Sequence, residues 1–279
     1  MSNLTIRAAL QWGGQMLAGF SSSLLEAEVL LAFILNYHRP QLFSRSEQLL
    51  TDAEWPRYQD VVLRRKRGEP VAYITGRREF WSLPLIVTPA TLIPRPETEM
   101  LVELTLEKLP PQPACRVADL GTGAGGIALA IASERPHWSM TATDKMPMAL
   151  EVAALNARQL AIHNVGFFLG EWCSALTGEF EVIVSNPPYI AAQDPHLSLD
   201  VVSYEPKEAL LAGAKGLADL QAIIQQAAGH LTSGGWLILE HGHEQQAAVQ
   251  ALLRVSGYRA IKSYKDLADL PRVTVAKKP

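Results

Sequence analysis

The tetrapeptide Asn186-Pro187-Pro188-Tyr189 carries the most specific chemistry in this sequence. The side-chain oxygen of Asn186 and the backbone carbonyl of Pro187 can both accept hydrogens from one planar nitrogen. Such a nitrogen is a weak nucleophile because its lone pair is delocalised, and two acceptors favour the positive charge that develops as it reacts. The prolines restrict the backbone so that the carbonyl points inward, and Tyr189 can stack on a planar group. We predict activation of an amide or amine nitrogen; the alternative is a plain turn, which Asn-Pro pairs also mark.

A glycine-rich segment upstream of the tetrapeptide predicts a loop that holds a nucleotide-like ligand. The run Asp119-Leu120-Gly121-Thr122-Gly123-Ala124-Gly125-Gly126 lies between a predicted strand and a predicted helix. Glycines allow a tight turn and a close approach of free backbone N–H groups to a ligand. Positions 121, 123 and 126 fit the spacing of dinucleotide-binding loops, whereas an acidic residue followed by alternating glycines fits S-adenosylmethionine-dependent methyltransferases. The glycines alone leave both interpretations open, beside that of a plain tight turn.

An acidic residue, Asp144, ends the next predicted strand. A carboxylate there can accept hydrogen bonds from both ribose hydroxyls of a nucleotide, and it can alternatively cap the following helix. In an open α/β sheet, ligands bind outside the carboxyl ends of the strands. The tetrapeptide directly follows a predicted strand, so we expect it to lie beside the glycine loop and Asp144.

Short apolar runs alternate with helical patterns from residue 116 onward, which indicates an α/β fold with helices on both faces of a parallel sheet. The segment between the last two strands has no helical pattern, so we expect these strands to form an antiparallel hairpin. The expected fold is a doubly wound, mostly parallel, seven-stranded Rossmann-like sheet. Its strands are predicted at 116–120, 139–143, 165–169, 180–185, 236–240, 259–263 and 272–276, and its helices at 126–134, 149–160, 217–231 and 245–255.

The first 75 residues have helical patterns. Ser23-x-x-Glu26 and Thr51-x-x-Glu54 are capping-box patterns, and each is expected to begin a helix. The basic run Arg64–Arg67 is expected in a last helical turn, where it complements the helix dipole. We interpret it as a solvated helix end, with contact to RNA or an acidic partner as the alternative.

Residues 76–100 differ in character from the segments on either side. Their β-type residues around a proline indicate an edge strand or a hairpin, and a helix is expected only after Pro96. We therefore predict three parts, namely a helical domain over 1–75, a hairpin linker over 76–100 and a sheet domain over 101–279.

The composition argues against several classes of protein. The 279 residues carry a formal net charge of −3, a poor match to a protein held on nucleic acid by phosphate contacts. The start lacks a leader pattern and no apolar run is long enough to span a membrane, so we expect a cytoplasmic protein. The two cysteines form no CxxC pair. His241 and His243 have no apparent third partner, so no metal site is predicted.

Together, these motifs resemble the release-factor glutamine methyltransferase family, a branch of the class I S-adenosylmethionine-dependent enzymes. The resemblance covers nearly the whole chain. Besides the glycine loop and the tetrapeptide, it rests on Gly68–Gly76, Glu79–Trp81, Leu92–Glu99, Tyr204–Pro206, Glu240–Gly242 and Arg272–Thr274. Ala124 stands where the family often has serine or threonine, which alters one hydroxyl contact and leaves the loop backbone unchanged.

The resemblance implies methylation of the side-chain amide nitrogen of the glutamine in the Gly-Gly-Gln motif of class 1 peptide-chain release factors. It implies S-adenosylmethionine as the donor and S-adenosylhomocysteine as the product. The helical domain and the 76–100 segment are then expected to help bind the release factor, with no membrane and no direct nucleic-acid partner.

The resemblance also implies a role for each site residue. Asp119 is expected to orient the loop or the methionine ammonium group of the donor. The implied cofactor-binding residues are Gly121, Thr122, Gly123, Ala124 and Gly125 near the methionine part, Asp144 at the ribose, Trp172 beside the adenine, and Asn186. The implied substrate-binding residues are Asn186, Pro187, Pro188 and Tyr189, of which Asn186 and Pro187 are expected to be catalytic.

Three other functions remain open at this point. An adenine-amine methyltransferase acting on DNA or RNA would use the same tetrapeptide, since a flipped adenine also offers a planar nitrogen. The net charge of −3 and the lack of an obvious target-recognition region argue against it. An NAD-dependent oxidoreductase leaves the tetrapeptide unexplained. A binding protein without turnover would not need the loop, Asp144 and the tetrapeptide together.

Overall fold

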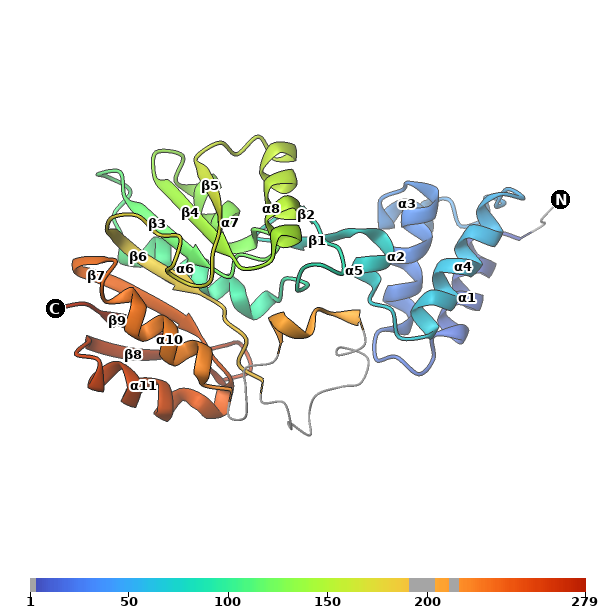
Figure 1. Cartoon of the computed structure of the whole chain (residues 1–279). Helices are drawn as coiled ribbons and strands as arrows, with labels where there is room; N and C mark the ends of the chain where they lie inside the picture. The colour runs from blue at the N-terminus through green and yellow to red at the C-terminus, as the bar shows by residue number, and fades with distance from the viewer. Residues whose placement is uncertain (1–3, 191–203, 211–215) are drawn as a thin grey trace. The chain divides into compact units, whose positions relative to one another are not determined.

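The structure, a computed structural model, describes residues 4–190, 204–210 and 216–279 (Figure 1). The chain divides into two compact units, Met1–Arg77 and Arg78–Pro279. Each of the three clusters of buried apolar side chains found in the described residues lies within one unit. Each unit therefore has a hydrophobic core of its own.

The larger unit is built on one seven-stranded sheet, in the order β5-β4-β3-β6-β7-β9-β8. Neighbouring strands are parallel from β5 through β7, whereas β9 is antiparallel to both β7 and β8. This confirms the predicted mostly parallel α/β sheet and its closing antiparallel hairpin. The strands are β3 (Arg116–Leu120), β4 (Ser139–Asp144), β5 (Val165–Leu169), β6 (Phe180–Ser185), β7 (Leu231–Glu240), β8 (Arg259–Lys265) and β9 (Pro271–Lys277).

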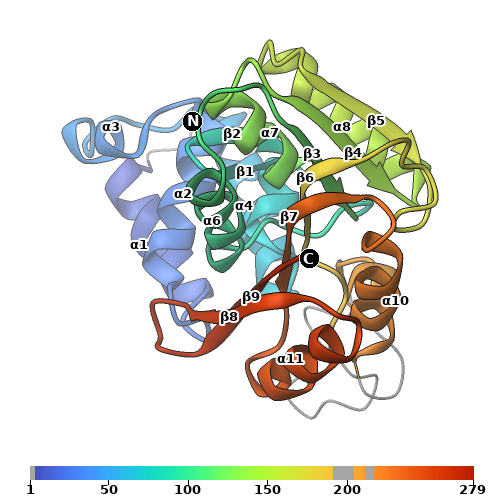
Figure 2. The ribbon, with the colours of Figure 1, turned by 90° about the vertical axis from the view of Figure 1, so that its left-hand side faces the viewer.

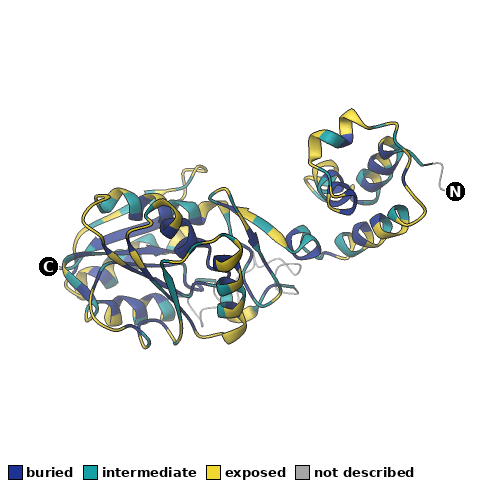
Figure 3. Cartoon of the chain, turned by 90° about the horizontal axis from the view of Figure 1, so that it is seen from above, coloured by how far each residue is buried: buried dark blue, intermediate teal, exposed yellow. Residues whose placement is uncertain are grey.

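Alternate residues of the central strands face two different cores, which is why these strands have nearly continuous apolar runs. Val182 and Val184 of β6 belong to one cluster of buried side chains, and Ile183 between them belongs to the other. In β7, Ile238 faces the first cluster and Leu237 the second. Figure 3 shows the buried residues concentrated along the sheet.

Helices cover both faces of this sheet. Helices α6 and α7 contribute to the first cluster on one face, and α10 and α11 to the second cluster on the other (Figure 2). No described helix is long and apolar enough to cross a membrane. The helices that the structure describes in this unit are η1 (Pro96–Thr98), α6 (Glu99–Lys108), α7 (Gly126–Glu134), α8 (Pro147–Gln159), η2 (Lys207–Ala209), α10 (Ala218–Ala227), η3 (His243–Gln245) and α11 (Gln246–Val255).

The segment before the sheet forms a hairpin of β1 (Arg77–Phe80) and β2 (Leu83–Ile86). Its turn residues, Trp81 and Ser82, have φ values of 51° and 59°. Two successive positive φ angles are what a two-residue type I′ turn requires, and that turn matches the twist of the flanking strands. Of the two predicted alternatives, an edge strand or a hairpin, the structure shows the hairpin.

Strand β7 begins at Leu231 rather than at the predicted Trp236, and helix α10 ends before Leu231. The predicted boundary followed the Gly-Gly pair, which is typical of a turn. Gly234 has a φ of +76°, and the register with β6 shifts there, from Phe180 opposite Leu231 to Val182 opposite Trp236. The glycine pair thus lies in an irregular, bulged part of the strand, where residues 232–235 stand opposite Glu181.

The smaller unit contains five helices among its described residues, packed around one apolar cluster. The predicted capping box is confirmed for helix α4, because the Glu54 N–H donates to Thr51 Oγ1 at 3.2 Å and the Thr51 N–H to Glu54 Oε2 at 2.8 Å. The corresponding prediction for Ser23 is wrong, since α2 already begins at Ser23 and Ser22 makes no side-chain capping bond. The helices are α1 (Ile6–Met16), α2 (Ser23–Leu35), α3 (Arg39–Ser44), α4 (Glu54–Lys66) and α5 (Val71–Thr75).

Two members of the basic run at the end of α4 are engaged inside this unit. Arg64 forms an ion pair with Glu69 at 2.5 Å, and Arg65 forms one with Glu26 at 2.8 Å. The Arg65 guanidinium also lies 3.8 Å from the centroid of the Phe20 ring. The interpretation as a solvated helix end is therefore wrong for Arg64 and Arg65, whose partners lie in the same unit.

Candidate active site

The carboxyl ends of three neighbouring strands bring the predicted site residues into one row. Leu120 at the end of β3 is paired with Thr143 of β4 and with Ser185 of β6. The next residue along each strand therefore emerges at the same edge of the sheet, where ligands bind in open α/β folds. These residues are Gly121, Asp144 and Asn186.

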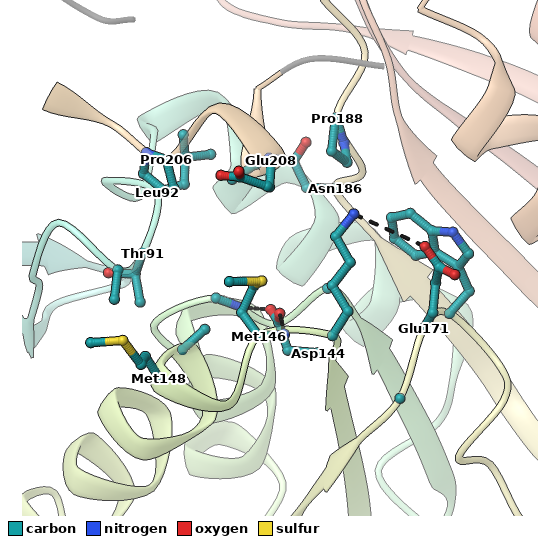
Figure 4. Close-up of a pocket in the computed structure, with 18 of the residues that line it drawn as sticks. Thr91, Leu92, Asp144, Met146, Met148, Glu171, Asn186, Pro188, Pro206 and Glu208 are labelled. Carbon is teal, nitrogen blue, oxygen red and sulfur yellow. Dashed lines mark hydrogen bonds and ion pairs between the residues drawn. The ribbon is translucent and has the colours of Figure 1, made fainter. Parts of the chain in front are cut away.

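A cavity of about 360 Å³ opens at this edge, a volume typical of small-molecule sites. Asp144, Met146 and Met148 lie on one side of it in Figure 4, and Asn186 and Pro188 lie on another. Its lining comes from the segment after the hairpin (Pro89, Ala90, Thr91, Leu92), the glycine loop (Gly121, Gly123), the segments at and after the ends of β4 and β5 (Asp144, Lys145, Met146, Met148, Ala149, Gly170, Glu171, Trp172) and residues beyond β6 (Asn186, Pro188, Pro206, Glu208, Ala209).

The glycine loop turns at positions that favour glycine. Gly121, Gly123 and Gly125 have φ values of +71°, +56° and +86°, all in the left-handed region. The N–H groups of Gly121 and Thr122 donate to the Thr143 carbonyl at 2.8 and 2.9 Å, which anchors the loop to β4. Gly121 and Gly123 line the cavity as predicted.

The side chain of Asn156 in α8 links the glycine loop to the hairpin through hydrogen bonds. Its Oδ1 accepts from the Ile86 N–H at 2.7 Å, and its Nδ2 donates to the carbonyls of Ile86 and Ala124 at 3.0 and 2.9 Å. Asn156 is 1 % exposed, so these bonds are shielded from water. Thr122, Ala124 and Gly125 lie outside the cavity lining, and their contact with a cofactor stays a prediction.

Asp144 presents to the cavity a carboxylate that the backbone holds in place. Its Oδ2 accepts a hydrogen bond from the Gly123 N–H and its Oδ1 from the Met146 N–H, both at 2.9 Å. Each carboxylate oxygen can accept more than one hydrogen bond. The side chain can therefore still bind the two hydroxyls of a ribose.

Asp119 lies beneath the loop and outside the cavity lining. Its Oδ2 accepts from the Thr122 hydroxyl at 2.6 Å and from the Ala128 N–H at 3.2 Å, while Oδ1 has no partner among the described residues. Burial raises the pKa of Asp119 to about 7, against these two hydrogen bonds. The bond to Thr122 supports the predicted role in orienting the loop.

Trp172 forms part of the cavity wall beside the loop. Its backbone has a φ of 51°, and its carbonyl accepts a hydrogen bond from the Thr143 hydroxyl at 3.0 Å. The indole packs close to Gly121, where an added Cβ would lie 3.4 Å from the ring. A flat apolar ring in this position can stack on an aromatic base, which supports the predicted place beside the adenine.

Asn186 and Pro188 of the tetrapeptide line the cavity. Asn186 Nδ2 donates a hydrogen bond to the Thr98 hydroxyl at 3.0 Å. Within the described part of the chain, no hydrogen bond engages Asn186 Oδ1. That oxygen is therefore available as an acceptor at the cavity.

Pro187 and Tyr189 lie outside the cavity lining. Pro187 is buried. The Tyr189 hydroxyl donates to Glu240 Oε1 at 3.2 Å, away from the predicted substrate. The carbonyl of Pro187 as an acceptor, and the stacking of Tyr189 on substrate, stay predictions.

Several lining residues were not predicted from the sequence. Lys145 Nζ and Glu171 Oε1 lie 4.0 Å apart in the cavity lining, and a dashed line to Glu171 marks the pair in Figure 4. The sequence signal that could have identified them is their position next to predicted site residues, since Lys145 follows Asp144 and Glu171 precedes Trp172. Leu92, Met146, Met148 and Glu208 belong to this set as well.

Glu205 positions the segment after the hairpin against the site. Its carboxylate accepts from the Ile93 N–H at 3.1 Å and pairs with Arg95 at 2.5 Å. Glu205 is 4 % exposed. The segments Leu92–Glu99 and Tyr204–Pro206 are both part of the resemblance to the family. The buried carboxylate of Glu205 holds them together.

The lining suits a cationic ligand that contains an aromatic base and a diol. Trp172 and Met146 offer apolar surface, and the carboxylates of Asp144, Glu171 and Glu208 outnumber the ammonium group of Lys145. S-adenosylmethionine has these parts. Among the described residues, no group of three or more His, Cys, Asp or Glu is placed to hold a metal.

Comparisons with known proteins agree with this site. A family model described as PrmC N-terminal domain matches residues 8–76, and one described as Methyltransferase small domain matches residues 98–261. The release factor glutamine methyltransferase of Salmonella typhimurium is 52 % identical over 250 residues, 89 % of this chain and 90 % of that protein. That of Coxiella burnetii is 47 % identical over 277 residues, 99 % of each chain.

A solved methyltransferase from Pyrococcus furiosus shares the fold. It aligns with a TM-score of 0.54 at 19 % identity and covers 79 % of this chain and 97 % of that one. The sequence matches extend over both units and include the glycine loop and the tetrapeptide. The chain belongs to the release factor glutamine methyltransferase family.

Proposed function

We propose that this protein transfers a methyl group from S-adenosylmethionine to the side-chain amide nitrogen of the glutamine in the Gly-Gly-Gln motif of class 1 release factors. The observation that carries this proposal is the unengaged Oδ1 of Asn186 at the cavity, one strand away from Gly121 and two strands away from the Asp144 carboxylate. Membership of the release factor glutamine methyltransferase family supports the substrate.

Asn186 acts on the acceptor nitrogen. An amide nitrogen shares its lone pair with its carbonyl, so it must gain positive charge as it attacks. The Asn186 oxygen accepts one N–H of the glutamine, and the Pro187 carbonyl is proposed to accept the other. Two acceptors stabilise the charge and aim the lone pair at the donor, and exclusion of water strengthens both bonds.

When bound, S-adenosylmethionine supplies a methyl group on a positively charged sulfur, so a direct in-line transfer moves that charge to the nitrogen. The chain needs no strong base, because the methylated nitrogen becomes acidic and can release its proton to water. The Asp144 carboxylate and the Trp172 ring are proposed to hold the ribose and the adenine. Positioning of the two partners can supply roughly 7–11 kcal/mol of the acceleration.

Release factors act in translation, so we propose the cytoplasm as the place of action. Cys115 and Cys173 are both free and buried, as expected for a protein kept in a reducing compartment. The release factor is the proposed partner, and the absence of direct nucleic-acid binding stays a prediction.

Mass spectrometry of an intact release factor after incubation with enzyme and S-adenosylmethionine tests the proposal. We expect a gain of one methyl on the Gly-Gly-Gln glutamine. Asn186→Ala should lower the single-turnover rate about 100–1,000-fold, by analogy with removal of one oxyanion-hole donor. Its affinity for S-adenosylhomocysteine, measured by calorimetry, reports whether the cavity is intact.

Parallel incubation with a DNA or RNA oligonucleotide separates the alternative activity. A methyl group found on adenine, with none on the release factor, would show that the enzyme methylates an exocyclic amine. A near-normal rate for Asn186→Ala would remove Asn186 from the mechanism.

A further inference from the structure

Two buried side chains, Thr98 and Glu240, lie directly behind Asn186. Ser185 is paired with Leu239, so the next residues, Asn186 and Glu240, emerge side by side at the ends of β6 and β7. Thr98 ends η1 and contacts both of them. Thr98 is 5 % exposed and Glu240 1 % exposed, and neither lines the cavity.

The Thr98 hydroxyl connects the amide to the carboxylate. It accepts a hydrogen bond from Asn186 Nδ2 at 3.0 Å and lies beside the Glu240 carboxylate, whose pKa it lowers. A hydroxyl has one hydrogen to donate, and an ionised carboxylate can only accept. While Glu240 is ionised, its carboxylate is the acceptor available to the hydrogen of Thr98, which leaves a lone pair to face Asn186.

This arrangement determines which way the Asn186 amide is turned. With a lone pair facing it, the amide presents its NH₂ group to Thr98 and directs its oxygen away. If the hydroxyl hydrogen were free, Thr98 could donate to Oδ1, and the amide could turn over. An NH₂ group would then face the N–H of the substrate, and the acceptor would be lost.

Glu240 also holds the far end of the tetrapeptide. The Tyr189 hydroxyl donates to its Oε1 at 3.2 Å, and Arg272 lies close enough to interact with both Tyr189 and Glu240. Oε2 has no partner among the described residues. One carboxylate thus contacts the tetrapeptide at both ends, directly at Tyr189 and through Thr98 at Asn186.

We propose that Thr98 and Glu240 are positioning residues for methyl transfer, which fix the Asn186 amide with its oxygen toward the acceptor nitrogen. The proposal rests on the proposed function. It assigns to Glu240 an effect on turnover without any contact with the donor or the glutamine.

The test compares single-turnover methylation of an intact release factor by four variants. Thr98→Val removes the hydroxyl at constant shape and should slow transfer by about 100-fold, the effect of a small misplacement at the reacting centre. Thr98→Ser restores the hydroxyl and should restore most of the rate. Glu240→Met should be as slow as Thr98→Val. Glu240→Gln keeps an acceptor oxygen and should be faster than Glu240→Met.

A double-variant cycle separates positioning from general weakening. Because Thr98 and Glu240 act as one unit, Thr98→Val in the Glu240→Met background should cost little further rate. Affinity for S-adenosylhomocysteine should stay at the parent value in all variants. If Glu240→Met does not fold, the Thr98→Val and Thr98→Ser pair still decides.

Thr98→Val at the parent rate, or Thr98→Ser as slow as Thr98→Val, would contradict the positioning role. If the parent chain methylates no release factor, the proposed function is wrong, and the positioning role must be tested without turnover. In that case the NMR signals of the Asn186 side-chain amide report its orientation. Thr98→Val must shift these signals and Thr98→Ser must leave them in place; any other pattern overturns the inference.

Discussion

At the scale of single residues, the carboxyl groups of Asp119 and Glu240 are buried outside the lining of the cavity. Burial raises the pKa of each to about 7, and neither has a complete set of partners among the described residues. Asp144 adds a nearby negative charge to Asp119. Glu240 faces Arg272, which favours its ionised form, and Glu97, which opposes it. Both groups therefore titrate near pH 7 rather than at about pH 4, so that Glu240 is mostly ionised only above about pH 7.

This burial predicts the direction of the pH dependence of stability. Asp and Glu carboxyls in an unfolded chain have a pKa near about 4, so between that pH and about 7 each of these two groups binds more protons in the folded protein than in the unfolded chain. Their contribution to the free energy of unfolding should therefore be highest at the acid end of this window and fall as the pH rises through it. Denaturant unfolding at a series of pH values, compared between the parent chain and a variant that lacks one of the two carboxyls, measures this contribution.

The control variants isolate Asp119. Asp119→Asn removes one of the two buried carboxyls, so the fall in unfolding free energy between about pH 4 and pH 7 should become shallower. Asp269→Asn changes a side chain that is 85 % exposed and should keep the parent slope. An unchanged slope in Asp119→Asn would show that the group titrates alike in the folded and unfolded chain.

Residues that depend on a local pattern could be predicted from the sequence, and those that depend on distant partners could not. The glycine loop, Asp144 and Asn186 stand out by their neighbours and by the strand that each follows. Thr98 lies in the resembling segment Leu92–Glu99, but its bond to Asn186 joins positions 88 residues apart and follows from no local pattern. Glu240 was included in the resemblance, but its partners become apparent only when β6 and β7 lie side by side.

At the scale of elements, strands β3, β5 and β6 and helix α7 begin and end at the predicted residues. Apolar runs mark the buried strands β3 and β6, and turn residues mark where each of them stops. Two predictions failed because a residue typical of turns or caps did not act as one. Gly234 lies in a bulge inside β7, and Ser23 does not cap α2.

The connection between α8, the hairpin and the glycine loop yields a prediction at this scale. Asn156→Ala would leave the buried N–H and carbonyl of Ile86 and the carbonyl of Ala124 without their partner. We expect a loss of about 2–3 kcal/mol in unfolding free energy. Both anchored segments lead to the cavity, so affinity for S-adenosylhomocysteine should also fall about tenfold, roughly 1.4 kcal/mol.

A second asparagine provides the matched control. Asn164 Nδ2 donates to the carbonyls of Ala132, Arg135 and Trp138 at 3.3, 3.2 and 3.1 Å, outside the cavity lining. Asn164→Ala should lower stability and leave the affinity for S-adenosylhomocysteine at the parent value. Equal losses of affinity in both variants would mean that Asn156 acts only through overall stability.

At the scale of the whole molecule, the two units, each with its own buried apolar clusters, suggest two separate functions. All described residues that line the cavity belong to Arg78–Pro279. The helical unit leaves large apolar side chains exposed, among them Leu25, Phe33 and Phe43 at 44 %, 44 % and 58 %. Exposed apolar side chains of this size offer surface that a partner protein can bury, which supports the proposed role of this unit in binding the release factor.

Removal of residues 1–77 tests this separation of functions. Because the larger unit has its own two apolar clusters, the shortened chain should fold and bind S-adenosylhomocysteine with the affinity of the full chain. Without the helical unit it should methylate an intact release factor with a KM raised at least about tenfold, roughly 1.4 kcal/mol of lost binding. A short Gly-Gly-Gln peptide makes no use of that surface and should be methylated equally by both chains. An unchanged KM for the intact factor would place the binding surface within the larger unit.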